Sequence, residues 1–198
     1  LAWDYGLNPS EIFPINLPSA NPGTPSPCVN PEGGHWVKDS VGWWYACADG
    51  STYLKGGWFT INGHDYQFGP SGYMATGFLK RMSGEWVYAD SDGALVSGWV
   101  KDGGQWYYLD PASHVMATGW VADRGSWYYL TGSGAMAIGW VNDGGTWYFL
   151  NASGKMATGW VKDRGTWYYL APSGAMLTGT HVINGRTYVF DDSGAWVR

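Results

Sequence analysis

The sequence predicts an all-β fold, a β-solenoid of stacked β-hairpin repeats. Three observations support this prediction: an excess of glycine and aromatic residues, a repeat of 20 or 21 residues, and β-prone runs that alternate with glycine-containing turns. The chain has 198 residues, of which 31 are Gly and 15 are Trp, and aromatic residues make up 18% of it. These values far exceed the usage of an average globular protein, so a repeated structural unit is needed to explain them.

The repeat runs from Trp36 to the end of the chain. Most units open on Gly-Trp, and a looser first copy at His35-Trp36 precedes Trp58 by 22 residues. Eight units result, the last of which ends at Arg198. The other seven units start at Gly57, Gly77, Gly98, Gly119, Gly139, Gly159 and Gly179.

One unit, residues 139–158, explains why hairpins are expected. A short extended run at 140–142 leads through Asp143-Gly144-Gly145 into a β-prone run at 146–150. A second turn contains Gly154, since glycine permits the positive φ that such turns demand. Alternation places apolar side chains on both faces of the hairpin, and a lone hairpin cannot bury both. Successive hairpins are therefore expected to stack and share a core.

The chain divides into four segments. The first contains six of the ten prolines and is expected to be a linker or the tail of an upstream domain. The last has Thr180 and Thr187 where other units have Trp, as expected of a cap whose outer face meets solvent. The segments are residues 1–27, the Pro-rich linker or tail; 28–56, a divergent N-terminal repeat; 57–178, the tandem aromatic repeats; and 179–198, the C-terminal capping repeat.

The two cysteines, Cys28 and Cys47, lie near the start of the repeats and outside any C-x-x-C spacing. We expect a disulfide between them; two unrelated thiols are the alternative. A disulfide would stabilise a segment that has few apolar residues, and it implies an oxidising, extracellular setting.

Composition excludes several functions. The formal charge of −5 and the pI near 5.1 argue against nucleic acid, because phosphate binding needs concentrated Lys and Arg. No apolar run approaches the roughly 20 residues that span a bilayer, so no membrane insertion is expected. The chain opens with Leu1 rather than a start methionine, which suggests processed or excised material.

No catalytic chemistry is expected, because catalytic sites are singular whereas the polar residues here recur with the repeat. Four aspartates occupy one turn position, which a turn role explains fully. The four histidines have no common spacing, so neither a metal site nor a cofactor is expected. These residues are Asp102, Asp123, Asp143 and Asp163, and His35, His64, His114 and His181.

The unit as a whole resembles a known family. Residues 159–170 read Gly-Trp-Val-x-Asp-x-Gly-x-Trp-Tyr-Tyr-Leu, and residues 173–179 read Ser-Gly-x-Met-x-Thr-Gly. This pattern resembles the choline-binding repeats of cell-wall-attached proteins in pneumococci and their phages, over about residues 35–198. Related repeats in glucan-binding and clostridial toxin proteins share its Gly-Trp and Tyr-Tyr-Phe skeleton.

The resemblance implies a non-catalytic anchoring module, secreted and bound non-covalently to the bacterial cell wall. Its ligand would be choline, carried as phosphocholine on teichoic or lipoteichoic acid, with wall polysaccharide as a further partner. In the family such modules accompany wall hydrolases or adhesin domains, so an attached enzyme would precede residue 1. Some members dimerise with choline, which makes a homodimer compatible with this assignment.

In that family, the ligand lies between consecutive hairpins. It is enclosed by the two Trp of one unit and by the first Tyr after the second Trp of the next, and a methionine usually lines the site. Carried over, the pattern gives Trp99, Trp106 and Tyr128; Trp120, Trp127 and Tyr148; Trp140, Trp147 and Tyr168; and Trp160, Trp167 and Tyr188, with Met116, Met136, Met156 and Met176 as lining residues.

Two further sets depart from the pattern, and a third position lacks a site. In the unit at Gly57, Asp65 stands where the second Trp belongs, so no three-ring site is expected there. The N-terminal unit has Leu54 in place of Met, and Cys47 indicates local remodelling. The two further sets are Trp36, Trp44 and Tyr66, whose rings satisfy the pattern, and Phe78, Trp86 and Tyr107, where Phe replaces the first Trp.

Aromatic rings suit choline for a direct physical reason. A quaternary ammonium has no N–H to donate, so ring faces rather than hydrogen bonds must hold it. Each ring contributes roughly 0.5 to 2 kcal/mol, and three rings together predict millimolar binding, about −4 kcal/mol. On a polymer that carries many such groups, weak sites in series anchor firmly.

Two other functions fit the same residues. In a glucan or wall-carbohydrate module, Trp and Tyr would form flat exposed platforms with hydrogen-bonding neighbours. In an adhesin or structural spacer, the aromatics would serve packing only. Packing is the interpretation for Val121, Tyr129, Leu130 and Tyr169, whereas the Trp pairs favour ligand contact, because packing alone would more often use Leu, Ile or Val.

Overall fold

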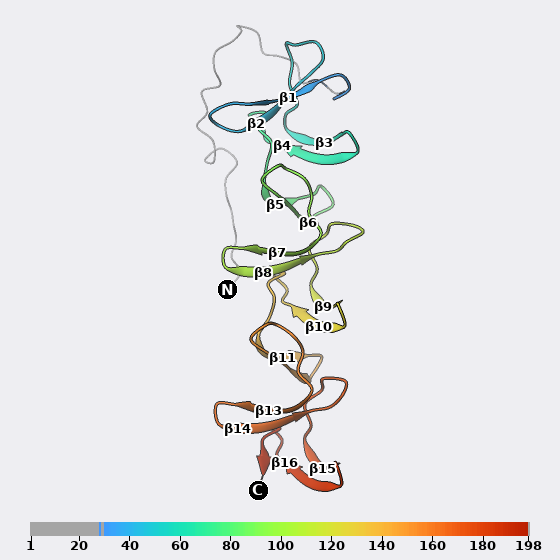
Figure 1. Ribbon diagram of the computed structural model, residues 1–198, viewed down its shortest axis with the longest axis vertical. Helices are drawn as coiled ribbons and strands as arrows, with labels where there is room; N and C mark the ends of the chain where they lie inside the picture. Colours follow the sequence, from blue (N-terminus) through green and yellow to red (C-terminus); the bar gives the residue numbers. More distant parts are fainter. Residues whose placement is uncertain (1–27, 29, 198) are drawn as a thin grey trace. The chain divides into compact units, whose positions relative to one another are not determined.

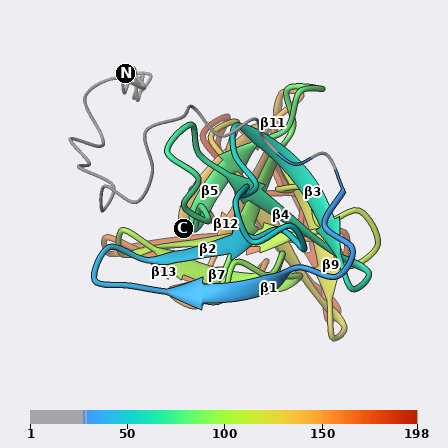
Figure 2. The ribbon, with the colours of Figure 1, turned by 90° about the horizontal axis from the view of Figure 1, so that it is seen from above.

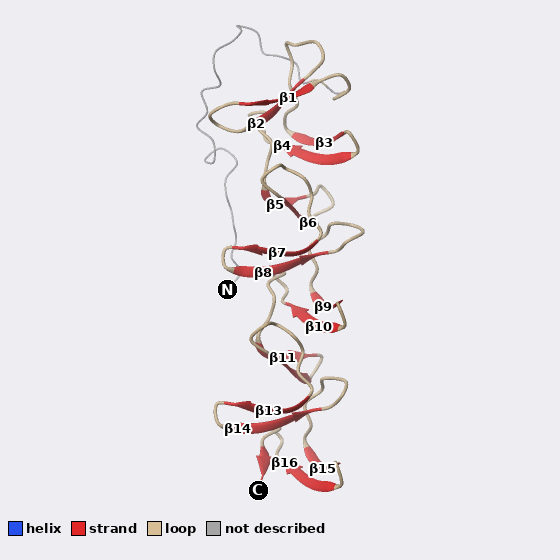
Figure 3. Cartoon of the chain, viewed as in Figure 1, coloured by secondary structure: helices blue, strands red, loops and turns tan. Residues whose placement is uncertain are grey.

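The computed structural model describes Cys28 and residues 30–197. In this part of the chain every regular element is a strand, and the strands form antiparallel hairpins joined by loops (Figures 1 and 3). The all-β hairpin fold is therefore confirmed. The predicted Pro-rich linker, residues 1–27, lies outside the described residues. The hairpins are β1 (His35–Lys38) with β2 (Trp43–Ala46), β3 (Gly57–Ile61) with β4 (His64–Phe68), β5 (Gly77–Lys80) with β6 (Trp86–Ala89), β7 (Gly98–Asp102) with β8 (Gln105–Leu109), β9 (Gly119–Asp123) with β10 (Ser126–Leu130), β11 (Gly139–Asp143) with β12 (Thr146–Leu150), β13 (Gly159–Asp163) with β14 (Thr166–Leu170), and β15 (Gly179–Ile183) with β16 (Arg186–Phe190), which also pairs with β17 (Trp196–Val197).

The hairpin turns explain the positions of several glycines. In β11–β12, Asp143 pairs with Thr146, which leaves Gly144 and Gly145 as a two-residue loop. Their φ angles are 56° and 88°, and positive φ at both central residues is what a type I′ turn requires. Such a turn twists in the same sense as the strands that it joins, so it suits the β11–β12 hairpin.

The described residues form two compact units, which divide between Val96 and Ser97. In the second unit the hairpins follow one another in chain order (Figure 1). Hairpin β13–β14 points the same way as β7–β8, three hairpins earlier, and the view from above agrees (Figure 2).

Leucines at the ends of the second strands form the core of the second unit. Leu150 pairs with Gly139 across the hairpin and with Met156 in the following loop. Its side chain is fully buried, as are those at the equivalent positions of the neighbouring hairpins. Each of these four hairpins thus contributes one aliphatic side chain to the core of the second unit; these are Leu109, Leu130, Leu150 and Leu170.

Methionines join one hairpin to the next. The backbone N–H of Met156 donates to the carbonyl of Trp127, 2.8 Å away in the preceding hairpin. Its sulfur packs on Gly174 of the following repeat, where a Cβ would overlap Sδ. Met136, Met156 and Met176 each contact the repeats before and after their own in this way, as the stacking of hairpins requires.

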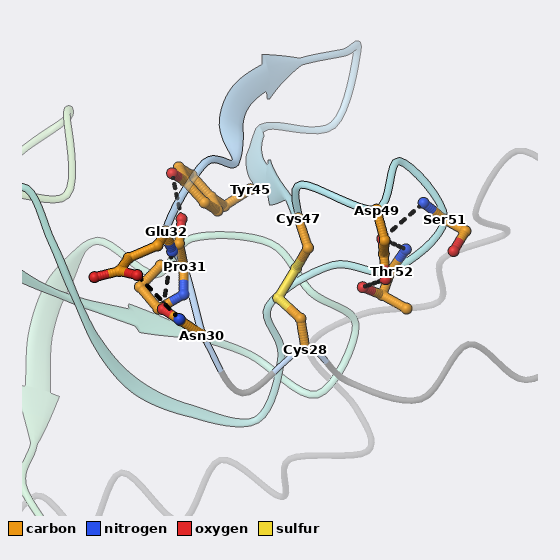
Figure 4. The surroundings of a disulfide bond; sticks show 9 residues. All are labelled: Cys28, Asn30, Pro31, Glu32, Tyr45, Cys47, Asp49, Ser51 and Thr52. Atoms are coloured by element: carbon orange, nitrogen blue, oxygen red, sulfur yellow. Dashed lines mark hydrogen bonds between the residues drawn. A yellow bond between two sulfur atoms is a disulfide. The ribbon is translucent and has the colours of Figure 1, made fainter.

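The N-terminal unit contains the predicted disulfide between Cys28 and Cys47 (Figure 4). Cys47 is buried with Leu54 and Phe68 in a hydrophobic cluster. The hydroxyl of Tyr45 donates to the carbonyl of Pro31, 2.9 Å away, and so holds the segment after Cys28 on the hairpin (Figure 4). The crosslink thus joins the entering chain to the core of this unit.

The described residues include no helix with the length and hydropathy that a membrane crossing requires. Among them there is also no group of three or more His, Cys, Asp or Glu side chains that could hold a metal ion.

Candidate ligand cages between hairpins

The two faces of each hairpin carry different side chains. In β9–β10, Trp120 pairs with Tyr129 and Ala122 with Trp127, so both Trp lie on one face. Tyr128 and the hairpin's Asp123 lie on the opposite face. Because consecutive hairpins stack, the Trp face of one hairpin meets the Tyr face of the next.

The rings predicted to share a site come together across this interface. The first Trp of each hairpin meets the Tyr of the next edge to face, with interplanar angles of 64° to 69°. The second Trp lies on the same face; Trp120 and Trp127 are 6.5 Å apart at 82°, and Trp160 and Trp167 are 6.2 Å apart at 87°. The ring centroid distances across the interface are 4.7 Å for Trp99–Tyr128, Trp120–Tyr148 and Trp140–Tyr168, and 4.9 Å for Trp160–Tyr188.

We number these sets as four cages. The first is Trp99, Trp106 and Tyr128; the second is Trp120, Trp127 and Tyr148; the third is Trp140, Trp147 and Tyr168; and the fourth is Trp160, Trp167 and Tyr188. The second Trp of each cage is between 39% and 48% exposed. An indole that served only to pack repeats together would be buried, so this exposure favours a binding role.

Aspartates orient the first Trp of three cages. The indole Nε1 of Trp120 donates to Oδ2 of Asp143 in the next hairpin, 3.0 Å away. The same bond joins Trp99 to Asp123 at 3.1 Å and Trp140 to Asp163 at 3.2 Å. A turn role alone, as expected from the sequence, is therefore wrong for these aspartates, since each also fixes an indole of the preceding repeat. Aligning the repeats shows which positions recur, but it does not show which side chains of neighbouring repeats are hydrogen-bonded to each other.

The fourth cage has an additional ring that the sequence analysis missed. Trp196 pairs with Phe190 in the register that Met176 has with Leu170 one repeat earlier. Its ring lies 5.8 Å from Trp160 and 5.9 Å from Tyr188. The signal was present in the sequence, because Ser-Gly-Ala-Trp at 193–196 aligns with Ser-Gly-Ala-Met at 173–176.

In the N-terminal set, Trp43 rather than Trp44 accompanies Trp36. The rings of Trp36 and Trp43 are 6.4 Å apart, and Tyr66 lies 4.9 Å from Trp36. Trp44 instead contacts Tyr53 at 6.2 Å. The placement of Trp44 in this set is therefore wrong. Strand register decides it, since neighbouring residues point to opposite faces.

Met74, not Leu54, provides the methionine of the N-terminal set. The N–H of Met74 donates to the carbonyl of Trp43, 2.7 Å away, as Met136 does to Trp106. Leu54 is fully buried in the core. Burial, and then the carboxylates of Asp90 and Asp92, raise the pKa of Tyr66, so its phenol stays neutral at physiological pH.

The other departures from the pattern differ in kind. Trp58 packs against an aliphatic cluster that includes Val87, and Asp65 accepts a hydrogen bond from Thr60, so no ring cage surrounds Trp58. Phe78 meets Tyr88 of its own hairpin at 4.9 Å, and Trp86 is 40% exposed. Because Tyr107 belongs to the other compact unit, the set of Phe78, Trp86 and Tyr107 stays a prediction.

The predicted lining methionines hold equivalent places. Met136, Met156 and Met176 each bond through their backbone to the second Trp of a cage. The side chains of all four predicted methionines, Met116 included, pack on a glycine of the following repeat. Packing between repeats is thus their observed role, and contact with a ligand stays a prediction.

Comparison with known proteins agrees with this architecture. A sequence profile of the choline-binding repeat matches residues 75–118, 96–139 and 137–180, and a profile of a cell wall binding repeat matches residues 56–74. No curated protein matches the chain closely enough to count as a relative.

Solved structures from Streptococcus pneumoniae are similar over most of the chain. CbpJ is 40% identical with a TM-score of 0.67, over 82% of this chain and 57% of CbpJ. CbpF is 37% identical with a TM-score of 0.67, over 82% of this chain and 57% of CbpF. The choline-binding domain of CbpL is 31% identical with a TM-score of 0.61, over 82% of this chain and 85% of that domain. The chain thus spans little more than half the length of CbpJ and CbpF.

Proposed function

Because this chain belongs to the family of choline-binding repeats, we propose that its four cages hold the choline head groups of a wall polymer and so anchor the protein to the bacterial cell surface. Repeats of this family bind the cell wall, and the matched repeats make this a binding module rather than a catalytic one. The polymer that we propose is teichoic or lipoteichoic acid bearing phosphocholine.

One observation carries the proposal: rings from consecutive hairpins converge edge to face, at 64° to 69°, beside partly exposed indoles. In the second cage, Trp120 and Trp127 are inclined at 82° and Tyr148 meets Trp120 at 69°. A compact cation without N–H groups is best held by several ring faces that approach from different directions. Converging rings supply this arrangement.

The rings of the cages already attract cations within the chain. The ammonium of Lys101 lies 5.9 Å from the ring centroid of Trp106, and that of Lys162 lies 5.6 Å from Trp167. These distances fall within the range of cation–π attraction. The partly exposed second Trp of a cage is therefore able to bind a positive charge.

The two rival functions need different geometry. A sugar platform requires coplanar exposed rings, whereas the cage rings stand at steep angles to one another. A spacer that uses its aromatics only for packing has no reason to leave the second Trp of four cages more than a third exposed. CbpF was solved in the presence of a peptidoglycan analogue, which supports wall polysaccharide as an additional partner.

Titration of tryptophan fluorescence tests the proposal. Choline should change the emission at millimolar to tens of millimolar concentration, because it contacts indoles that are otherwise solvated. The neutral isostere 3,3-dimethylbutanol, which has a tert-butyl group in place of the ammonium, should bind far more weakly. An equal response to the isostere, or a response to soluble glucan alone, would overturn the assignment.

Secretion and self-association complete the proposal. The disulfide between Cys28 and Cys47 supports an oxidising, extracellular setting. A homodimer that forms with choline is compatible with the family and stays a prediction. Analytical ultracentrifugation with and without choline tests it, and an unchanged sedimentation coefficient would contradict it.

A further inference from the structure

The cages differ in the residue that faces their second Trp across the hairpin. Lys101 pairs with Trp106 in the first cage, and Lys162 pairs with Trp167 in the fourth. In each pair the ammonium lies over the indole, at 5.9 Å and 5.6 Å from the ring centroid. The second cage has Ala122 at this position and the third has Asn142. Only the first and fourth cages therefore have a lysine ammonium over the ring of their second Trp.

The acidic residue beside each cage also differs. Asp123, Asp143 and Asp163 bond to the first Trp of the first, second and third cages. In the last hairpin, Ile183 stands at this position and is buried. Arg186 is its cross-strand partner, at the place that Thr166 has one hairpin earlier.

The local charge of the cages therefore changes along the chain. The first cage has one lysine and one aspartate, and the second and third have an aspartate without the lysine. The fourth cage has Lys162 over its ring and Arg186 on the face that supplies Tyr188, with no aspartate bonded to Trp160. Two basic side chains thus lie at the cage that also has the fourth ring, Trp196. Asp191 and Asp192 lie in the loop before Trp196, where the carboxylate of Asp191 accepts hydrogen bonds from the backbone N–H groups of Ser193 and Ala195.

We infer that the fourth cage selects phosphocholine over bare choline, whereas the second and third cages do not. This inference rests on the proposed function and concerns the ligand preference of those same sites. A lysine beside the cage repels the bare cation, which lowers the affinity for choline. In phosphocholine, a short ethylene ester joins the ammonium to a phosphate, and a phosphate pairs strongly with Lys and Arg. The aspartates of the second and third cages act in the opposite sense.

Two variants of the full chain separate the classes of cage. Trp127→Ala with Trp147→Ala weakens the second and third cages, so that the first and fourth dominate the measured binding. Trp106→Ala with Trp167→Ala does the reverse. All four indoles are partly exposed, so the fold should survive, and circular dichroism checks this. The aromatic residues of the N-terminal unit are the same in both variants.

The measured quantity is the ratio of the dissociation constants for choline and for phosphocholine, determined by calorimetry at one ionic strength. The ratio should be about three- to fivefold higher in the variant that keeps the fourth cage, a factor typical of an exposed ion pair. Adding Lys162→Ala and Arg186→Thr to that variant should remove the difference. Arg164→Gly is the matched control, because it removes a positive charge from the turn of the same hairpin, where Gly144 stands one hairpin earlier.

A gain of function provides the second measurement. In the variant that keeps the second and third cages, Asn142→Lys should raise the ratio, because it places a lysine across from Trp147 as in the fourth cage. Equal ratios in both variants, unmoved by either lysine substitution, would overturn the inference and leave the proposed function standing. If neither folded variant bound either ligand, the proposed function and the inference would fall together.

Discussion

Different side chains of one hairpin serve packing and the proposed ligand binding. In each hairpin that supplies the two Trp of a cage, the leucine at the end of the second strand is fully buried, as Leu130 is, whereas the second Trp stays partly exposed. Asp143 holds the indole of Trp120 in place through a bond of 3.0 Å. The residues that stabilise the fold and those proposed to bind a ligand are thus neighbours on one hairpin, and substitutions should separate their roles.

Replacing Trp127 and Trp147 with Leu should weaken choline binding while it leaves the far-UV circular dichroism nearly intact. Each cage would lose one ring face, which costs about 1 kcal/mol, or about a fivefold loss of affinity. Trp58→Leu is the matched control, because Trp58 packs on an aliphatic cluster where no cage forms; it should lower stability without changing choline affinity. Collapse of the double variant would instead favour a purely structural role for its indoles.

Asp143→Ala should weaken binding at the second cage alone. Its carboxylate accepts from Trp120 Nε1, so its loss frees the indole to rotate and also removes a negative charge near the ligand. We expect about a two- to fivefold loss of choline affinity at that cage, typical of an exposed polar contact. Asp192→Ala is the control, because Asp192 lies in an exposed turn; it should leave choline affinity unchanged. The indole N–H resonances in NMR spectra distinguish the cages.

The connecting loops position the hairpins as much as the strands do. The loops after β10, β12 and β14 each carry a methionine that bonds backward to the preceding hairpin and packs forward on a glycine of the next repeat. Gly154 has φ of 78°, and a Cβ there would overlap Met136. The glycine is therefore required both by the backbone conformation and by the contact between repeats.

Gly154→Ala should lower the free energy of unfolding by about 2 kcal/mol, because a left-handed conformation alone costs a non-glycine residue about 1 to 2 kcal/mol and the new methyl group displaces Met136. Gly132→Ala is the matched control, since the same kind of turn has open space around Gly132 and no positive φ is found there. Urea denaturation measures both variants. Equal stability of the two variants would contradict the proposal that Gly154 is required for Met136 to pack between the repeats.

At the scale of the whole chain, repetition converts weak sites into firm attachment. Once one cage is occupied on a polymer, the next binds at a high effective concentration, so overall strength grows much faster than the affinity of a single cage. The disulfide between Cys28 and Cys47 lies in the N-terminal unit, away from the four cages in sequence.

Disabling cages one after another should therefore reduce retention on a choline-bearing resin steeply. Removing the second Trp from two of the four cages should lower the apparent affinity for the resin by tenfold or more, while the affinity of each remaining cage for free choline stays within about twofold. Calorimetry with choline and elution from the resin give the two quantities. Retention that falls only in proportion to the number of cages would contradict anchoring by several sites at once.

Reduction of the disulfide should affect stability but not the four cages. Cys28→Ser with Cys47→Ser should destabilise the N-terminal unit by about 2 to 4 kcal/mol, because the crosslink no longer restricts the unfolded chain. Choline binding at the second and third cages should be unchanged. Thermal unfolding followed by circular dichroism, with and without reductant on the unsubstituted chain, provides the comparison.

The sequence by itself determined the hairpins, their period, and the set of rings that converge in the four cages, because these follow from alternation along a strand and from turns with positive φ. It also contained the spacing that places Trp43 with Trp36, since seven residues separate the paired Trp of the four cages. Contacts between repeats were decided only by the tertiary structure. Stacking brings Asp123 to Trp99 and Met74 to Trp43. Such contacts depend on how one hairpin packs on the next, which no pattern within a single repeat records.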